Sequence, residues 1–236
     1  MNENPPDISV FFPLFNEEGN VRHITLSAIA ALTQITGKFE VLLINDGSND
    51  RTREIGEELS SCDSRVRVIS HDTNLGYGAA LKTGFEESKF DLIAFTDGDG
   101  QFDLSEIRLL LNKLPHHDAV IGFRVRRADP AVRTLNAKAW GFLIGVLFGI
   151  WPRDLDCGFK LFKRELIKQM ELEANGAFIS TELLAKSRRL NARIAEVGVT
   201  HYPRAAGEST GNNLIVIIKA FGELARFWIY LKRWRP

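Results

Sequence analysis

The amino-acid sequence predicts an α/β fold in three layers with a mostly parallel central sheet. Strand-like and helix-like segments alternate through the first half of the 236-residue chain, and such alternation implies right-handed crossovers between parallel strands. The runs 41–44 (VLLI) and 92–95 (LIAF) are apolar throughout, as expected of strands covered on both faces. A chain of this length, 44% hydrophobic and 25% charged, can bury a sizeable core.

The elements of the first half follow from the spacing of apolar residues. Apolar or alternating runs bounded by turn residues predict strands at 8–15, 39–46, 65–72, 91–97 and 118–124. Apolar residues at helical spacing predict helices at 20–34, 48–61, 76–88 and 104–114. Ser48 and Asp50 are candidate N-caps of the second of these helices.

The second half of the chain is less regular. We expect a long apolar segment at 137–151, a strand and then a helix at 157–170, a helix at 180–190 and a strand at 192–203. Because no internal repeat or linker is evident, we expect one domain over 1–211, followed by an amphipathic helix in 212–236.

The bulk composition excludes several classes of protein. Lysine plus arginine number 30, as do aspartate plus glutamate, and this balance argues against a nucleic-acid binder, which needs a basic excess. Cys62 and Cys157 form no Cys-x-x-Cys pair, so we expect neither a zinc knuckle nor a redox motif, and a reducing compartment is favoured. We also expect no secretory signal and no membrane span, because no apolar run reaches about 18 residues.

Three of the expected strands end in polar turns, FNEEGN, NDGSND and TDGDGQ. Ligands bind beyond the carboxyl ends of the strands in such sheets, so we expect these turns to converge on one crevice. In the last turn, Asp97 and Asp99 are separated by a single glycine, and carboxylates this close repel each other unless a cation lies between them.

A divalent cation explains this carboxylate pair. Mg²⁺ and Mn²⁺ take one or two carboxylates, keep water and bind substrate phosphates, and Gln101 offers a further oxygen. The alternative is a solvated acidic turn, because Asp-Gly pairs are common turn formers. The position at a strand end, beside two other polar strand ends, favours the metal site.

The segment 76–83 (GYGAALKT) resembles two phosphate-binding motifs but matches neither. Leu81 stands where a P-loop requires glycine before Lys82, and also where the last glycine of Gly-x-Gly-x-x-Gly is required. We expect Gly76 and Gly78 to permit close packing, or the approach of an anion to N–H groups at a helix start.

Together, these segments resemble the family 2 glycosyltransferases with the Rossmann-like GT-A fold, and specifically the branch of dolichol-phosphate mannosyltransferases and polyprenyl-phosphate glycosyltransferases. The matching segments run in the family's order along nearly the whole chain: 11–21, 41–52, 74–85, 97–101, 122–127, 153–165 and 202–210. The resemblance implies a hexosyltransferase that uses a nucleotide sugar.

The resemblance also implies a donor site. The residues expected to bind the nucleotide sugar are Pro13, Phe15, Glu17, Asp46, Gly76 and Asp97. Asp46 would meet the base, and Asp97, Asp99 and Gln101 would hold Mg²⁺ or Mn²⁺ on the diphosphate. Asn45 departs from the family, which commonly has a second aspartate at this position, so the base preference stays open.

A basic segment after the fifth strand predicts a site for the acceptor. It contains Arg124, Arg126, Arg127 and Arg133, and guanidinium groups suit phosphate oxygens; the alternative is a solvated basic loop. We expect Arg124, Arg127 and Arg133 to bind the acceptor phosphate, and the resemblance implies this role for the first and the last.

The expected activity is inverting, metal-dependent transfer of a hexose from a nucleotide sugar of the GDP-mannose or UDP-glucose type to dolichyl or undecaprenyl phosphate. A divalent ion stabilises the charge on the leaving diphosphate, and a phosphate acceptor is already ionised. The expected catalytic residues are Asp99, Asp154 and Asp156; the last two orient the acceptor or sugar, unless they are only turn or cap residues. The alternatives are a hydroxyl acceptor, for which one of the last two would be the general base, and a non-catalytic nucleotide-sugar-binding subunit.

Two apolar segments predict contact with a membrane surface. Residues 139–151 carry no charge but are too few to span a bilayer. In the C-terminal helix one face is polar, and the other carries Ile217, Ile218, Phe221, Leu224, Ala225, Trp228 and Ile229. With Trp234 among basic residues, this pattern predicts an interfacial helix and peripheral attachment to the cytosolic face of the membrane. The alternative is a helix packed on the domain or in an oligomer contact.

Overall fold

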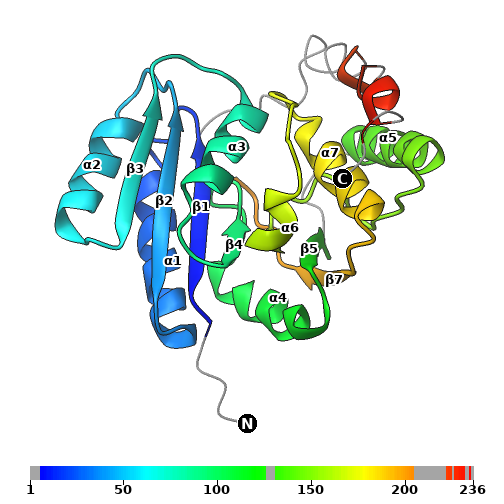
Figure 1. Cartoon of the computed structure of the whole chain (residues 1–236). Helices are drawn as coiled ribbons and strands as arrows, with labels where there is room; N and C mark the ends of the chain where they lie inside the picture. Colours follow the sequence, from blue (N-terminus) through cyan, green and yellow to red (C-terminus); the bar gives the residue numbers. More distant parts are fainter. Residues whose placement is uncertain (1–5, 126–130, 205–221, 225, 232–233, 235–236) are drawn as a thin grey trace.

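The computed structural model describes residues 6–125, 131–204, 222–224, 226–231 and 234, with the backbone alone for 131–138. Its strands are β1 (Ile8–Leu14), β2 (Phe39–Asp46), β3 (Val66–His71), β4 (Leu92–Phe95), β5 (Ala119–Arg124), β6 (Lys160–Lys163) and β7 (Ile194–Val199). They form one sheet in the order β3-β2-β1-β4-β6-β5-β7 (Figure 1). The predicted α/β architecture is confirmed.

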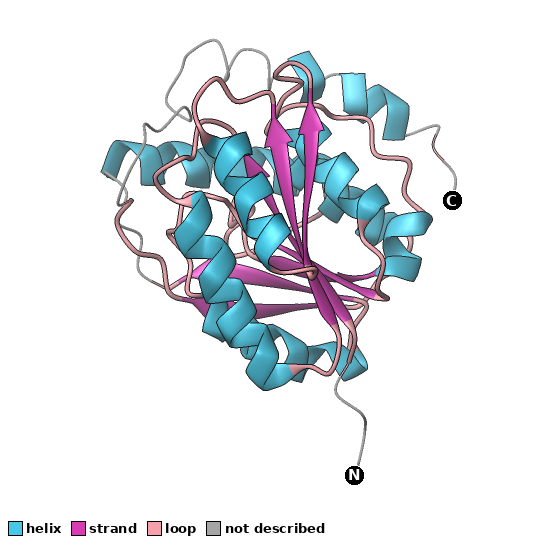
Figure 2. Cartoon of the chain, turned by 90° about the vertical axis from the view of Figure 1, so that its left-hand side faces the viewer, coloured by secondary structure: helices cyan, strands magenta, loops and turns pink. Residues whose placement is uncertain are grey.

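The sheet is mostly parallel, as predicted. β1 pairs in parallel with β2 and β4, β2 with β3, and β5 with β7. Only β6 runs antiparallel, between β4 and β5, among the described strands. Figure 2 shows the strands fanning out across the sheet, as the right-handed twist of strands requires. The carboxyl ends of β1, β2 and β4 therefore lie side by side.

Helices cover both faces of the sheet. They are α1 (Val21–Ile35), α2 (Thr52–Cys62), α3 (Tyr77–Glu87), η1 (Leu104–Glu106), α4 (Ile107–Lys113), η2 (Leu114–His116), α5 (Ala131–Phe148), α6 (Arg164–Lys168) and α7 (Ile179–Arg189). One core cluster joins α1, α2 and α4 to one face of the sheet, and a second joins α3, α6 and α7 to the other. A third cluster joins α5 and the C-terminal helical residues 222–224 and 226–231 to α7.

Two helix starts differ from the sequence prediction. α2 begins at Thr52, and Asp50 Oδ1 accepts from the Thr52 N–H at 3.0 Å. Ser48 Oγ instead accepts from the Asn16 N–H at 3.0 Å, so it ties two loops together. α5 begins at Ala131, six residues before the apolar run from which it was predicted. Apolar spacing locates the apolar stretch of a helix and not its first residue, so both starts were misplaced.

The C-terminal helical residues pack on the domain. Leu224, Phe227 and Leu231 are buried at spacings of three and four, and the Phe227 ring lies 5.5 Å from that of Phe148 in α5. The prediction that Leu224 faces a membrane is therefore wrong, because its helix face completes a core cluster. Trp228 and Ile229 are exposed, as expected, whereas Ile217, Ile218, Phe221 and Ala225 lie outside the described residues.

A buried ion pair lies beneath this C-terminal segment. Lys186 Nζ is 2.7 Å from Glu182 Oε1, and neither side chain is exposed at all. Glu182 also accepts from the backbone N–H groups of Glu173 and Ala174. The aromatic rings of Phe227, Tyr230 and Trp234 cover the ammonium at 4.9–5.9 Å. The pair thus joins α7, the preceding loop and the C-terminal segment.

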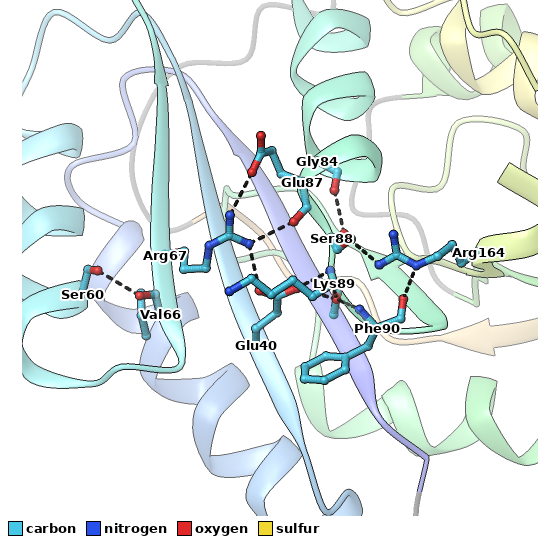
Figure 3. Close-up of polar contacts among 11 residues, drawn as sticks. Glu40, Ser60, Val66, Arg67, Gly84, Glu87, Ser88, Lys89, Phe90 and Arg164 are labelled. Carbon is cyan, nitrogen blue, oxygen red and sulfur yellow. Dashed lines mark hydrogen bonds and ion pairs between the residues drawn. The ribbon is translucent and has the colours of Figure 1, made fainter. Parts of the chain in front are cut away.

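A second polar network lies at the amino-terminal ends of β1, β2 and β3 (Figure 3). Buried Glu40 accepts from Ser9 Oγ at 2.7 Å, from the Lys89 N–H at 2.6 Å and from Arg67 at 3.0 Å. Arg67 also binds Glu87 at the end of α3. The turn from α3 into β4 is therefore held to the start of β1 and β2.

Candidate active site

Asp97 and Asp99 lie in the loop that leaves the carboxyl end of β4. Gly98 permits this path, because a Cβ there would be 2.3 Å from the Leu14 side chain and 2.8 Å from the Pro13 carbonyl oxygen. The loop therefore runs directly over the end of β1, beside the predicted nucleotide-site residue Pro13. The strand-end convergence expected from the sequence is present.

Asp97 is held from two sides. Tyr77 at the start of α3 donates its hydroxyl to Asp97 Oδ1 at 2.8 Å. On the other side, a Cβ at Gly158 would be 2.1 Å from Asp97 Oδ2, so the carboxylate packs against bare backbone. Removal from water and the negative charge of Asp99 raise the pKa of Asp97 to about 6. A bound cation would relieve this cost by favouring the charged carboxylate.

Asp99 faces a cation that the sequence analysis did not assign. Its Oδ1 accepts from the Gln101 N–H at 3.1 Å, and its Oδ2 lies 3.3 Å from Arg204 Nη2. The same nitrogen is 3.0 Å from Glu17 Oε1. Arg204 lies within the matched segment 202–210, but no local pattern distinguishes it, because its partners lie 105 and 187 residues away.

Glu17 is brought to the acidic loop, as its predicted role in the donor site requires. Its backbone N–H donates to Thr52 Oγ1 at 2.8 Å, and its Oε2 accepts from Asn20 Nδ2 at 2.6 Å. Burial raises the pKa of Glu17 against the effects of Asn20 and Arg204, and the charge of Asp99 raises it further. Phe15, also predicted here, is exposed over 38% of its surface and remains available to a ligand.

Gln101 ties the acidic loop to the segment after β7. The side-chain NH₂ of Gln101 donates to the Tyr202 backbone carbonyl oxygen at 2.8 Å, and the backbone carbonyl oxygen of Gln101 accepts from the Tyr202 N–H at 2.8 Å. An adjacent bridge pairs Phe102 with His201. The predicted metal ligand thus has a structural task for its amide nitrogen, and any metal contact falls to its amide oxygen.

Asp46 and Gly76 are joined to each other in this structure. Asp46 Oδ2 accepts from the Gly76 N–H at 2.9 Å, and its Oδ1 accepts from the Leu75 N–H at 2.9 Å and bonds to His71 Nδ1 at 2.7 Å. The Gly76 N–H therefore binds Asp46. Of the two expectations for Gly76 and Gly78, close packing is confirmed, because a Cβ at either position would lie 2.4 Å from a backbone carbonyl oxygen. Asp46 is 3% exposed, so here its carboxylate fixes the loop that enters α3.

Arg124 and Asp154 form a buried, two-pronged ion pair. Arg124 Nε and Nη2 lie 2.7 and 2.9 Å from the two Asp154 oxygens, and the side chains are only 8% and 3% exposed. Asp154 thus orients the arginine that we expected to bind the acceptor phosphate. Asp156 is exposed. Arg127 and the Arg133 side chain lie outside the described residues, so the predicted arginine cluster is represented here by Arg124.

Lys160 is a charged residue that the sequence analysis missed. It is fully buried in β6 and donates to the carbonyl oxygens of Leu155 and Cys157. Burial lowers the pKa of Lys160, and the charges of nearby acids, Asp97 among them, oppose that shift. The loop 153–159 thereby joins the two halves of the site: it supplies Asp154 to the arginine and Gly158 to Asp97. The available signal was a lysine flanked by the apolar residues Phe159 and Leu161.

The residues present fit a divalent ion of the Mg²⁺ type. Asp97 and Asp99 supply the one or two carboxylates that such an ion takes from protein, the rest of its shell being water and substrate phosphate. Among the residues that the structure describes, no group of three or more His, Cys, Asp or Glu side chains could hold a metal.

Comparison with known sequences gives consistent matches. The sequence model of glycosyl transferase family 2 matches residues 9–170. The chain is 29% identical over 232 residues to glycosyltransferase AglD from Haloferax volcanii, covering 94% of this chain and 37% of that protein. It is 31% identical over 210 residues to an undecaprenyl-phosphate 4-deoxy-4-formamido-L-arabinose transferase from Shewanella sediminis, covering 88% and 62%. The chain thus spans less than two thirds of these relatives.

Comparison with solved structures confirms the predicted GT-A fold. Glucosyl-3-phosphoglycerate synthase from Mycobacterium tuberculosis, in complex with Mn²⁺, UDP-glucose and phosphoglyceric acid, superposes with a TM-score of 0.72 at 20% identity, over 94% of this chain and 80% of that one. Its complex with UDP gives a TM-score of 0.71 at 21% identity. At these identities the likeness establishes the fold alone.

Proposed function

The chain belongs to glycosyl transferase family 2, and from that premise we propose that it transfers a hexose from a nucleotide sugar to the phosphate of a polyprenyl lipid. The relative named for undecaprenyl phosphate supports this acceptor class. We propose further that the donor is of the GDP-mannose or UDP-glucose type, that Mg²⁺ or Mn²⁺ is required, and that the anomeric configuration inverts.

One observation carries this proposal: the two ends of one short loop contact an acidic residue and an arginine. Gly158 packs against Asp97, and Asp154, four residues earlier, holds Arg124 in a two-pronged pair. The acidic end suits a cation and its diphosphate, and the guanidinium at the other end suits the oxygens of a phosphate acceptor. A donor and an anionic acceptor placed at these ends would meet across the loop.

The chemistry asks for positioning and for stabilisation of charge. When bound at Asp97 and Asp99, a divalent ion would stabilise the negative charge that develops on the leaving nucleoside diphosphate. The acceptor phosphate, ionised at neutral pH, attacks the anomeric carbon from the face opposite to the leaving group. Arg124 holds that phosphate and Asp154 fixes the guanidinium. No side chain has to remove a proton.

We propose that the protein attaches peripherally to the cytosolic face of a membrane through the outer face of α5. Phe142, Val146 and Trp151 are 66%, 61% and 62% exposed, and the rings of Phe142 and Trp151 are 5.9 Å apart. Side chains of this kind favour the membrane interface. Exposed Trp228 and Ile229 add apolar surface on the neighbouring C-terminal helix. None of the helices described is long and apolar enough to cross a membrane.

Incubation of the purified protein with labelled nucleotide sugars and Mg²⁺ or Mn²⁺ tests the function. We expect label in a lipid product with undecaprenyl or dolichyl phosphate and none with oligosaccharides, and we expect Asp99→Ala to abolish turnover in a folded protein. Transfer to oligosaccharides that requires Asp156 would indicate a hydroxyl acceptor. Nucleotide-sugar binding without any turnover would indicate a non-catalytic subunit.

A further inference from the structure

A single guanidinium nitrogen of Arg204 contacts two of the acidic side chains at the donor site. Nη2 lies 3.0 Å from Glu17 Oε1 and 3.3 Å from Asp99 Oδ2. All three side chains are mostly buried: 23% of Arg204, 10% of Glu17 and 14% of Asp99 is exposed. Ion pairs with so little exposure are screened weakly by solvent, so this contact is stronger than a surface pair.

The backbone that carries Arg204 is fixed to the acidic loop. Two hydrogen bonds of 2.8 Å join Gln101 to Tyr202 in opposite directions, and Phe102 pairs with His201. Arg204 is two residues beyond these ties. The position of the guanidinium is therefore built into the fold, and movement of the arginine side chain is enough to release the carboxylates.

A divalent ion and Arg204 compete for Asp99. The Asp99 oxygen that faces the guanidinium is one of the ligand atoms available at the predicted metal site. An ion bound there would place two positive groups on one carboxylate at contact distance, where like charges oppose each other strongly. Arg204 therefore neutralises the acidic loop in the free protein and opposes the binding of a metal ion on its own.

We propose that Arg204 occupies the cation position in the free protein and is exchanged for a divalent ion when a nucleoside diphosphate binds. The diphosphate offers the released guanidinium a new partner with matching oxygen geometry. Metal and nucleotide consequently bind cooperatively, and the coupling is reciprocal. This exchange rests on the proposed donor site. It adds that neither the metal ion nor the nucleotide binds tightly until the other is present.

Binding of Mn²⁺, followed by the electron paramagnetic resonance signal of the free ion, tests the exchange without requiring transfer. For the wild-type protein we expect UDP or GDP to tighten Mn²⁺ binding at least about fivefold. Arg204→Gln should bind Mn²⁺ alone at least about fivefold tighter than the wild type and should lose most of the nucleotide effect. Arg53→Gln, which removes an equally charged but exposed arginine of α2, should match the wild type.

The outcomes separate the exchange from the donor site on which it rests. The exchange is overturned if Arg204→Gln binds Mn²⁺ no more tightly than the wild type does. It is also overturned if UDP or GDP leaves the Mn²⁺ affinity of the wild type unchanged. Arg204→Ala gives the same comparison if the glutamine variant does not fold, and the wild-type measurement needs no variant. If Asp99→Ala binds Mn²⁺ as tightly as the wild type, the ion lies elsewhere and the donor-site proposal itself fails.

Discussion

A methyl group added at residue 158 should disable the site by displacing one carboxylate. In Gly158→Ala the new Cβ would lie 2.1 Å from Asp97 Oδ2 and 2.3 Å from its Cγ, whereas real Cβ contacts essentially never fall below 3.0 Å. The Asp97 carboxylate must therefore move by about 1 Å, and a displacement of that size at a catalytic group costs about 10²-fold in rate. We expect kcat for hexose transfer to fall by about that factor.

The matched control is Gly141→Ala. A Cβ at Gly141, in the middle of α5, meets nothing within 4 Å, and alanine is favoured over glycine in a helix by about 1 kcal/mol. Both variants should therefore fold, as circular dichroism and thermal unfolding will show, while only the first loses activity. If Gly158→Ala keeps its rate within about threefold of the wild type, Asp97 does not need its observed position and the reasoning from its packing is refuted.

Three further predictions follow from buried or exposed groups outside the acidic loop. Lys186→Met should lower the free energy of unfolding by about 3–5 kcal/mol, because it leaves the fully buried Glu182 without its cation. Urea unfolding measures this free energy, and a loss below about 1 kcal/mol would contradict the prediction. Hydrogen bonds from Arg193 lower the pKa of Asp118 to about 2 from its usual 3.8. Asp118 therefore contributes stability above pH 3.8 that is lost as the pH falls towards 2. The difference in free energy of unfolding between the wild type and Asp118→Asn should shrink between about pH 5 and about pH 3, and a constant difference would argue against the assignment. Trp151→Ala should reduce co-sedimentation with vesicles that contain anionic lipid, whereas Leu26→Ala, which removes an exposed side chain on α1, should not; equal binding of both variants would place membrane contact elsewhere.

The sequence predicted the elements that local pattern determines. Buried parallel strands appear as continuous apolar runs, so β2 and β4 were located to within a few residues. Because parallel strands end at a common edge, the convergence of Asp97, Asp99 and Glu17 followed from the order of the elements alone. The start of α5 was missed because the apolar run from which the helix was predicted begins six residues after Ala131.

Pairings between distant residues were not predictable in this way. The partner of Arg124 is one such case, because Asp154, which holds it in a buried fork, lies thirty residues later. Arg204 contacts Asp99 across 105 residues. The membrane-facing side of the C-terminal helix was misjudged at Leu224, because helical spacing reveals an apolar face without showing what covers it.

The central claim is that Asp97 and Asp99 promote the departure of a nucleoside diphosphate from a sugar that is passed to a lipid phosphate. The most direct measurement is the anomeric configuration, by nuclear magnetic resonance, of the sugar phosphate formed from a labelled nucleotide sugar and a short polyprenyl phosphate, with Mn²⁺ and after chelation. The account predicts a product of inverted configuration that is absent after chelation and absent with Asp99→Ala. A product of retained configuration, or undiminished transfer after chelation, would contradict it.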